Sequence, residues 1–222
     1  MNKIILSIDA SCSNCSTSLF YNKKIDSITE KYKINQTKEI LIMINKLLKN
    51  RKISLKLLDA ISFTTGPGKF TGIRTVINIA QSLALGTRIK LFPISTLLTI
   101  AERAWRKKNI KKIVVTLNAN HHQAYWAKYI RNNNGVWKTI KKDSLITILE
   151  LNKKINLLSD NWTVIGNVYK KLTINPKILI NKEIFFPHAK DIIPFTLLYL
   201  NKNTKNKIKK VFPNYLNTLG LN

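Results

Sequence analysis

The chain has 222 residues, 45% of them hydrophobic, and its 38 lysine and arginine residues against 11 aspartate and glutamate residues give a formal net charge of +27. This length suffices for one large domain or for two smaller lobes, each with a core of its own. No uninterrupted apolar run is long enough to cross a bilayer, so we expect a cytoplasmic protein that makes no membrane contact.

The first half of the sequence alternates between strand and helix patterns. Three strand-like runs come first with short turns between them, which is typical of an antiparallel meander. The expected elements are strands at 3–9, 16–22 and 25–32, a helix at 37–50, a strand at 58–65, a helix from about Gly72 to Leu85, a strand at 88–94 and a helix capped by Ser95 or Thr96.

The second half repeats this pattern. Residues 111–130 mirror residues 3–22, because in each segment an apolar strand ends in a short polar turn and a second strand follows. The turn residues Asp9, Ala10 and Ser11 align with Asn118, Ala119 and Asn120. Further elements are expected at 135–142 (strand), near 143–152 (weak helix) and at 162–166 (strand).

This repetition indicates two related α/β lobes. We place the boundary near Asn109, with an N-terminal lobe at 1–109 and a C-terminal lobe at 110–222. A polar stretch near 201–210 in the second lobe is expected to be loose.

Two cysteines, Cys12 and Cys15, form a C-x-x-C spacing in the first turn. A structural zinc site would need a second pair of ligands, which the sequence lacks, and a redox C-x-x-C normally opens a helix. We therefore expect free thiols, and the sequence does not reveal what else these cysteines do.

A glycine-rich loop, TTGPGKFTGIR, occupies residues 64–74. It fails the G-x-x-x-x-G-K-[ST] pattern of phosphate-binding loops at both ends, because Phe63 holds the first glycine's place and Phe70 follows Lys69. Gly66 and Gly68 still permit unusual dihedral angles, Thr71 can cap the next helix, and amides at that helix start could bind an anion. A plain connection without a ligand explains the loop equally well.

The same loop carries a resemblance to a known family. PGKFTGIR, followed by VINIAQSLALG, closely resembles the corresponding loop and helix of the TsaB family. Other segments resemble that family in the same order along most of the chain, namely ILSIDAS, PISTL, AERAWR, AYWAKY and FPNYLN. Several ordered motifs at compatible spacing make chance similarity a poor explanation.

The resemblance implies an α/β fold of the actin, hexokinase and Hsp70 ATPase class (ribonuclease H-like), with duplicated lobes that each hold a mixed sheet and flanking helices. It also implies an inactive relative of TsaD, the subunit that, with the ATPase TsaE, moves threonylcarbamoyl from threonylcarbamoyl-AMP to N6 of the adenosine beside the anticodon of tRNA. This chain is then expected to bind and support TsaD as a non-catalytic partner and to meet tRNA only indirectly.

The resemblance also bears on the site. Asp9 stands where active members of the fold hold a metal-phosphate group, but its counterpart in the second lobe is the neutral Asn118. The three histidines lack helical metal-ligand spacing. We therefore expect no catalytic residue, no metal and no cofactor in this chain, with ATP and metal on the partner subunits. The expected remnant of a phosphate loop comprises Asp9, Ser11, Gly66, Gly68, Thr71 and Gly72.

Two helices have a second face that a partner could use. In the helix at 37–50 the predicted core stripe is Ile40, Leu41, Ile44, Leu47 and Leu48, which leaves Ile42 on the opposite side. The outer side of the next helix lacks lysine, and depletion of charge is typical of interface cores. The predicted partner interface comprises Ile42, Met43, Thr75, Asn78, Ser82 and Leu85, and it could also join two copies of the chain when TsaD is absent.

Two other functions stay open. A small-molecule kinase or ATPase of the same fold would bind ATP through Asp9. A charge-driven tRNA-binding module would use the net charge of +27, although only six of the 38 basic residues are arginine and the lysines are spread along the chain. The abundance of lysine, asparagine and isoleucine together also fits an AT-rich codon pool. The charge by itself therefore does not decide whether the chain binds tRNA.

Overall fold

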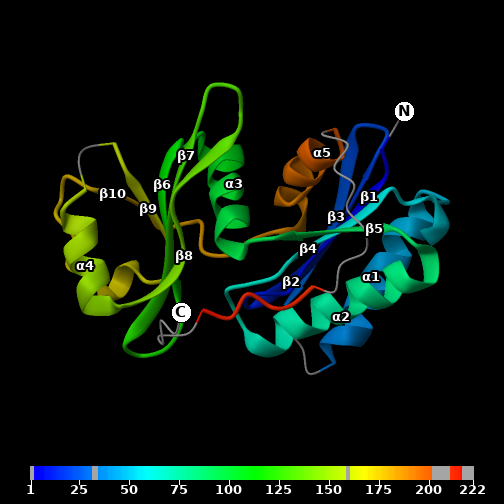
Figure 1. The fold of residues 1–222 in the computed structure, drawn as a ribbon, viewed down its shortest axis with the longest axis horizontal. Helices are drawn as coiled ribbons and strands as arrows, with labels where there is room; N and C mark the ends of the chain where they lie inside the picture. The colour runs from blue at the N-terminus through cyan, green and yellow to red at the C-terminus, as the bar shows by residue number, and fades with distance from the viewer. Residues whose placement is uncertain (1–2, 32–34, 159–160, 202–210, 217–222) are drawn as a thin grey trace. The chain divides into compact units, whose positions relative to one another are not determined.

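The computed structural model describes residues 3–31, 35–158, 161–201 and 211–216 (Figure 1). The chain divides into two compact units, the first formed by Met1–Thr99 with Pro187–Asn214 and the second by Ile100–Phe186 with Tyr215–Asn222. The boundary predicted near Asn109 therefore lies too late in the chain. The predicted assignment of all residues after Asn109 to one lobe also misses a helix that the sequence analysis did not reveal, α5 (Ile193–Asn201), which packs on the first sheet. The loose stretch predicted at 201–210 lies, from residue 202 on, outside the described residues.

The sheet of the first unit has five strands in the order β3-β2-β1-β4-β5. Strand β2 pairs antiparallel with β1 and with β3, whereas β1, β4 and β5 run parallel. The meander predicted from the sequence is therefore confirmed. The strands are β1 (Ile5–Asp9), β2 (Asn14–Tyr21), β3 (Lys24–Lys31), β4 (Ala60–Thr64) and β5 (Lys90–Ile94).

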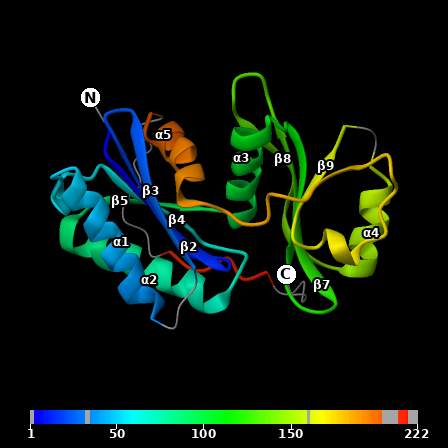
Figure 2. The same cartoon turned by 180° about the vertical axis from the view of Figure 1, so that it is seen from behind.

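Helices cover both faces of this sheet. α1 (Gln36–Asn50) and α2 (Phe70–Thr87) cover one face and α5 covers the other (Figures 1 and 2). Leu6 and Ile8 of β1 belong to the core under α1 and α2, while Ile5 packs in a separate cluster with Ile193 of α5. Strand β1 is thus buried on both faces, which explains its unbroken apolar run. None of the helices in the described ranges is both long and apolar enough to span a membrane.

The sheet of the second unit has the order β10-β9-β6-β7-β8. β6 pairs antiparallel with β7 and parallel with β9, just as β1 pairs with β2 and β4. The predicted duplication of one α/β pattern is therefore confirmed. The strands are β6 (Lys112–Asn118), β7 (Gln123–Arg131), β8 (Trp137–Thr147), β9 (Thr163–Gly166) and β10 (Leu179–Asn181). The remaining elements of the two units are α3 (Thr96–Lys108), α4 (Ile148–Asn156) and the short 3-10 helices η1 (Leu55–Leu57), η2 (Tyr169–Lys171) and η3 (Ala189–Asp191).

The helix predicted near 143–152 begins later, at Ile148, because strand β8 continues to Thr147. The Thr147 hydroxyl accepts a hydrogen bond from Glu150 N at 3.2 Å and donates one to Glu150 Oε2 at 3.1 Å. This local arrangement of a threonine with a glutamate three residues later fixes the start of α4.

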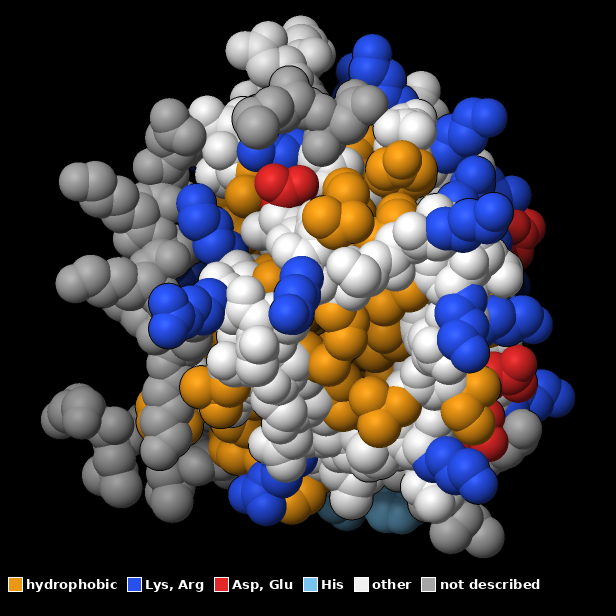
Figure 3. Space-filling view, turned by 90° about the vertical axis from the view of Figure 1, so that its right-hand side faces the viewer, with side chains coloured by type: hydrophobic (Ala, Val, Ile, Leu, Met, Phe, Trp, Pro, Cys, Tyr) orange, Lys and Arg blue, Asp and Glu red, His pale blue; other side chains and the backbone are white. Residues whose placement is uncertain are grey.

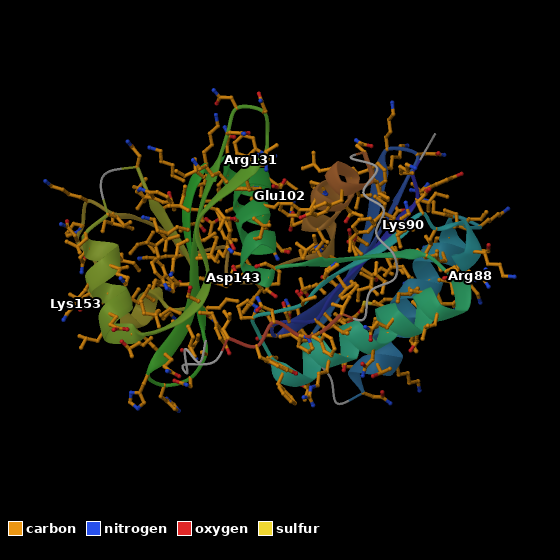
Figure 4. The ribbon with its side chains drawn as sticks, viewed as in Figure 1. Arg88, Lys90, Glu102, Arg131, Asp143 and Lys153 are labelled. Atoms are coloured by element: carbon orange, nitrogen blue, oxygen red, sulfur yellow. The ribbon has the colours of Figure 1, made fainter. Side chains whose placement is uncertain are left out.

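A buried ion pair lies in the second unit between α3 and the end of β7 (Figure 4). Arg131 Nη1 and Trp137 Nε1 both donate to Glu102 Oε2, the latter over 2.6 Å. The Arg131 guanidinium lies 4.8 Å from the ring centroid of Trp105 and 5.4 Å from that of Trp137. Helix α3 is therefore attached to the sheet by a charged and aromatic cluster that the sequence analysis did not anticipate.

Candidate functional site

The Asp9 carboxylate holds together the turn that follows β1. Its Oδ1 accepts hydrogen bonds from the Ser11 hydroxyl at 2.7 Å, the Ser11 amide at 3.2 Å and the Thr64 hydroxyl at 2.7 Å. All three residues are buried. The carboxylate thus binds groups of its own chain. Thr64 was missed by the sequence analysis, because nothing local connects it with Asp9.

The glycine loop packs directly on this turn. Lys69 N donates to Ser11 O over 2.7 Å, so the loop backbone touches the turn backbone. A Cβ atom added to Gly72 would lie 1.9 Å from Ala10 O, and one added to Gly68 would lie 2.3 Å from Ser11 O. Gly66 has φ +108° and its carbonyl accepts from Thr96 N at 2.9 Å. The glycines therefore permit a close contact within the chain.

Helix α2 begins one residue before the predicted cap. Lys69 occupies the N-cap position without a side-chain cap bond, and Thr71 lies inside the first turn of the helix. The predicted capping role of Thr71 is therefore wrong. The physical reason is that the Lys69 amide is held by Ser11 while its carbonyl already accepts from Ile73 N at 3.0 Å. At α3 the predicted cap is confirmed for Ser95, whose hydroxyl accepts from Leu98 N at 3.2 Å.

The equivalent turn of the second unit uses an amide in place of the carboxylate. Asn118 is exposed, its N donates to Asn167 Oδ1 at 2.7 Å, and its own Oδ1 accepts from Lys171 Nζ at 2.8 Å. Asn120 Oδ1 accepts from the backbone N of His122 and of Gln123. An ammonium group from η2 therefore lies beside this turn, where the first unit has hydroxyl groups.

Possible metal ligands do not gather into one place. Within the described ranges, no three histidine, cysteine, aspartate or glutamate side chains lie close enough together to hold a metal ion. His188 caps η3 by accepting from Lys190 N and also forms a hydrogen bond with the Thr29 hydroxyl at 3.0 Å.

Cys12 and Cys15 are free thiols, and both are buried. Burial raises the pKa of both thiols, and the Asp9 carboxylate raises the pKa of each further. Such thiols carry little thiolate at neutral pH and are poor nucleophiles.

Most of the residues predicted for the partner interface lie on the surface of α1 and α2. Asn78 and Ser82 are exposed, and Ile42 and Leu85 are 49% and 75% exposed; Thr75 is half-buried. Two assignments on α1 were wrong. Met43 is 3% exposed and belongs to the core, while Leu41 is 44% exposed and lies outside it. The helix is rotated so that Met43, and not Leu41, completes the stripe that packs on the sheet.

These faces include further features that the sequence analysis overlooked. An open hollow of about 560 Å³ lies along α1, lined by residues that include Lys38, Leu41, Ile42 and Asn45. On α2 the Arg74 guanidinium lies 3.8 Å from the ring centroid of the exposed Phe70. Figure 3 shows the side of the first unit seen from the right of Figure 1, where hydrophobic side chains gather and lysine and arginine side chains stand mainly around them.

Comparison with known proteins agrees with this architecture. A family model described as "TsaD: tRNA N6-adenosine threonylcarbamoyltransferase" matches residues 28–187. A tRNA threonylcarbamoyladenosine biosynthesis protein TsaB from Buchnera aphidicola subsp. Schizaphis graminum (strain Sg) is 44% identical over 96% of this chain and 100% of its own length. The protein of that name from Escherichia coli (strain K12) is 29% identical over 96% of this chain and 94% of its own length.

The solved structure of YeaZ from Pseudomonas aeruginosa superposes with a TM-score of 0.83 at 23% identity, covering 96% of this chain and 100% of that chain. The fold is therefore the duplicated α/β fold that this YeaZ structure also has, with a five-stranded mixed sheet and flanking helices in each unit, as the sequence indicated. The chain belongs to the TsaB family.

Proposed function

We propose that this chain is a non-catalytic subunit that binds a TsaD-type catalytic subunit and supports the formation of threonylcarbamoyladenosine beside the anticodon of tRNA. The biosynthetic role follows from membership of the TsaB family. The observation that carries the pairing role is the exposed outer face of α2, from Asn78 and Ser82 to Leu85, with Ile42 exposed on α1. Interface cores are depleted in charge in the same way.

The turn at Asp9 supports the absence of catalysis in this chain. A carboxylate that holds a metal-phosphate group must face an open site, whereas Asp9 is 1% exposed and accepts hydrogen bonds from Ser11 and Thr64. The glycine loop lies against the same turn and takes Ser11 O as a partner for its own amide. We therefore assign the binding of ATP and metal to the partners, namely the TsaD-type subunit and a TsaE-type ATPase. We also propose that the reaction takes place in the cytoplasm.

The pairing is tested by mixing the purified chain with a TsaD-type subunit and measuring the mass of the product by light scattering. The parent chain should form a mixed complex, and Ser82→Glu should weaken it by at least about 30-fold, because a carboxylate would be buried without a partner. Ser54→Glu is the matched control, because Ser54 is also exposed but precedes η1 and is not part of the predicted interface. Persistent separation of the two parent proteins at micromolar concentration would contradict the proposal.

The light-scattering mass of the chain alone shows whether the same face joins two copies. A dimer of the parent chain that Ser82→Glu dissociates would mean that the α1 and α2 faces self-associate when no partner is present. A dimer that Ser82→Glu leaves intact would place self-association on another surface.

A kinase or ATPase of the same fold is the competing function. Calorimetry with ATP and magnesium separates the two: the parent chain should give no binding heat at micromolar concentration. Tight binding that Asp9→Ala abolishes would replace the accessory role with an enzymatic one.

A further inference from the structure

Three lysine side chains converge on a cavity of the second unit. The cavity has a volume of about 370 Å³ and lies between the β7–β8 hairpin and α4. Lys128 from β7, Lys141 from β8 and Lys154 from α4 line it together with Trp126 and Ser144. The residues that line it, all from the described part of the chain, include no carboxylate.

The strand register places two of these lysines opposite each other. Lys128 pairs directly with Lys141, and like charges at such positions destabilise a sheet. The register shifts on both sides of this pair, between Trp126 and Lys128 and between Lys128 and Tyr129. Such bulges bend a strand and redirect its side chains. The hairpin is therefore irregular at the point where two ammonium groups face the same hollow.

Among the residues that the structure describes, none of the three lysines forms an ion pair with a carboxylate. Lys128 is half-buried, with its Nζ 4.3 Å from the ring centroid of Trp162, and burial lowers the pKa of its ammonium group. An anion in the cavity would offset the positive charge of the lysines that line it.

We infer that this lysine cavity, defined by Lys128, Lys141 and Lys154, binds backbone phosphate of RNA. The inference rests on the proposed function in one respect, because it takes the RNA to be the tRNA that the TsaD-type subunit modifies. The cavity then gives this chain a direct contact with the substrate, in addition to its pairing with the catalytic subunit.

The chemistry of the cavity favours RNA backbone over a base or a membrane. Lysine meets phosphate as a point charge and carries no planar fork for reading base edges, so its contacts position a nucleic acid without selecting a sequence. An anionic membrane is a flat surface, whereas these ammonium groups surround a hollow whose lining includes the buried Trp126. The formal net charge of +27 adds a long-range attraction for any polyanion.

The test measures binding of a labelled tRNA transcript to the purified chain by fluorescence anisotropy between about 50 and 200 mM salt. The variant carries Lys141→Gln and Lys154→Gln, both at exposed positions; Lys128 is left unchanged because it packs on Trp162. The matched control carries Lys177→Gln and Lys182→Gln, which remove two exposed lysines of the same unit outside the cavity. Thermal unfolding confirms that all three proteins are folded.

The cavity variant should bind tRNA about tenfold more weakly than the control near 100 mM salt, and its plot of log affinity against log salt should be shallower by about 1 to 2 units. Equal affinities and slopes for the cavity and control variants would overturn the inference. Loss of binding to phosphatidylserine vesicles in the cavity variant, with unchanged tRNA binding, would overturn it in favour of a membrane.

The same variants distinguish this inference from the proposed function. The cavity variant should still pair with the TsaD-type subunit, because its substitutions lie in the second unit and Ser82 is unchanged. Conversely, Ser82→Glu should lose the pairing and bind tRNA alone as the parent does. Failure of the parent chain to pair with the TsaD-type subunit would count against the proposed function. It would not affect the test of phosphate binding, which uses the purified chain alone.

Discussion

The first and second units contain sheets of the same strand order, but the turns after their first strands are held by different chemistry. In the first unit a buried carboxylate, Asp9, accepts from Ser11 and Thr64, and the glycine loop closes over the turn. In the second unit the amide of Asn118 is exposed and accepts from Lys171. The same topology therefore tolerates a charged, enclosed turn and a neutral, open one.

The two turns differ in the groups that they leave available to a ligand. Here the first turn uses its acceptor for hydroxyl groups of its own chain, and the second has replaced the carboxylate by an amide. Each unit has a glycine in close backbone contact with its first strand or the turn after it, namely Gly72 in the first turn of α2 and Gly166 at the end of β9.

The largest effect is expected at those two glycines. A Cβ atom at Gly72 would lie 1.9 Å from Ala10 O, and at Gly166, where φ is +114°, it would lie 1.7 Å from Thr116 O. Gly72→Ala and Gly166→Ala should each destabilise the fold by about 4 kcal/mol or more, because backbone atoms must move. Urea unfolding measures this. Gly86→Ala is the control, because nothing lies within 4 Å of its Cβ position. Equal free energies of unfolding for all three variants would show that the close contacts at Gly72 and Gly166 do not limit stability.

The next effect concerns a buried charge on a helix of the second unit. Glu102 on α3 accepts from Arg131 and Trp137 in the cluster shown in Figure 4. Glu102→Gln should destabilise the fold by about 3 kcal/mol, because the partly buried Arg131 guanidinium loses its counter-charge. Calorimetric unfolding measures it. Glu183→Gln removes the exposed pair with Lys108 and should leave the unfolding temperature unchanged. Equal shifts in the two variants would show that burial of the pair is unimportant.

A smaller effect compares the two turns directly. Asp9→Asn should cost about 2 kcal/mol, because hydrogen bonds from the Ser11 and Thr64 hydroxyls lose a charged acceptor. Asn118→Asp should change stability by at most about 1 kcal/mol, because the new carboxylate is exposed and faces Lys171. Urea unfolding of both variants tests the contrast. Equal costs at the two positions would mean that the enclosed turn gains nothing from its carboxylate.

Much of the fold could be predicted from the sequence, because its signals are local. The apolar run of β1, the serine before α3 and the repeated strand-turn-strand pattern each need only neighbouring residues. Helix α5 could not be predicted in the same way. Its sequence, IPFTLLYLN, is apolar almost throughout, so no periodicity separates a buried helix from a strand. Its place on the first sheet also depends on contacts with residues near the start of the chain, such as Ile5.

The candidate site was predictable only where its partners are close in sequence. The bond from Ser11 to Asp9 spans two residues and follows from turn chemistry, whereas the bond from Thr64 spans 55 residues and has no local signal. On α1 both Leu41 and Met43 are apolar, so the pattern alone fits either rotation of the helix. Packing against the sheet selects Met43. The lysine cavity depends in the same way on a register shift that the sequence does not reveal.

The smallest effect is expected from the two thiols of the first unit, Cys12 in the turn after β1 and Cys15 in β2. The folded-state pKa values of Cys12 and Cys15 are raised, chiefly by burial, so the unfolded chain releases these protons at a lower pH than the folded chain does. Their contribution to stability is therefore present at neutral pH and falls as the pH rises above about 8.5. Between about pH 7.5 and 9.5 the parent should lose about 1 kcal/mol more than a Cys12→Ala, Cys15→Ala variant.

Urea unfolding of the two proteins across this pH range measures the difference. Parallel pH profiles for the parent and the cysteine-free variant would contradict the raised pKa values of the two thiols. They would show that the first unit excludes water from these thiols less completely than their burial indicates.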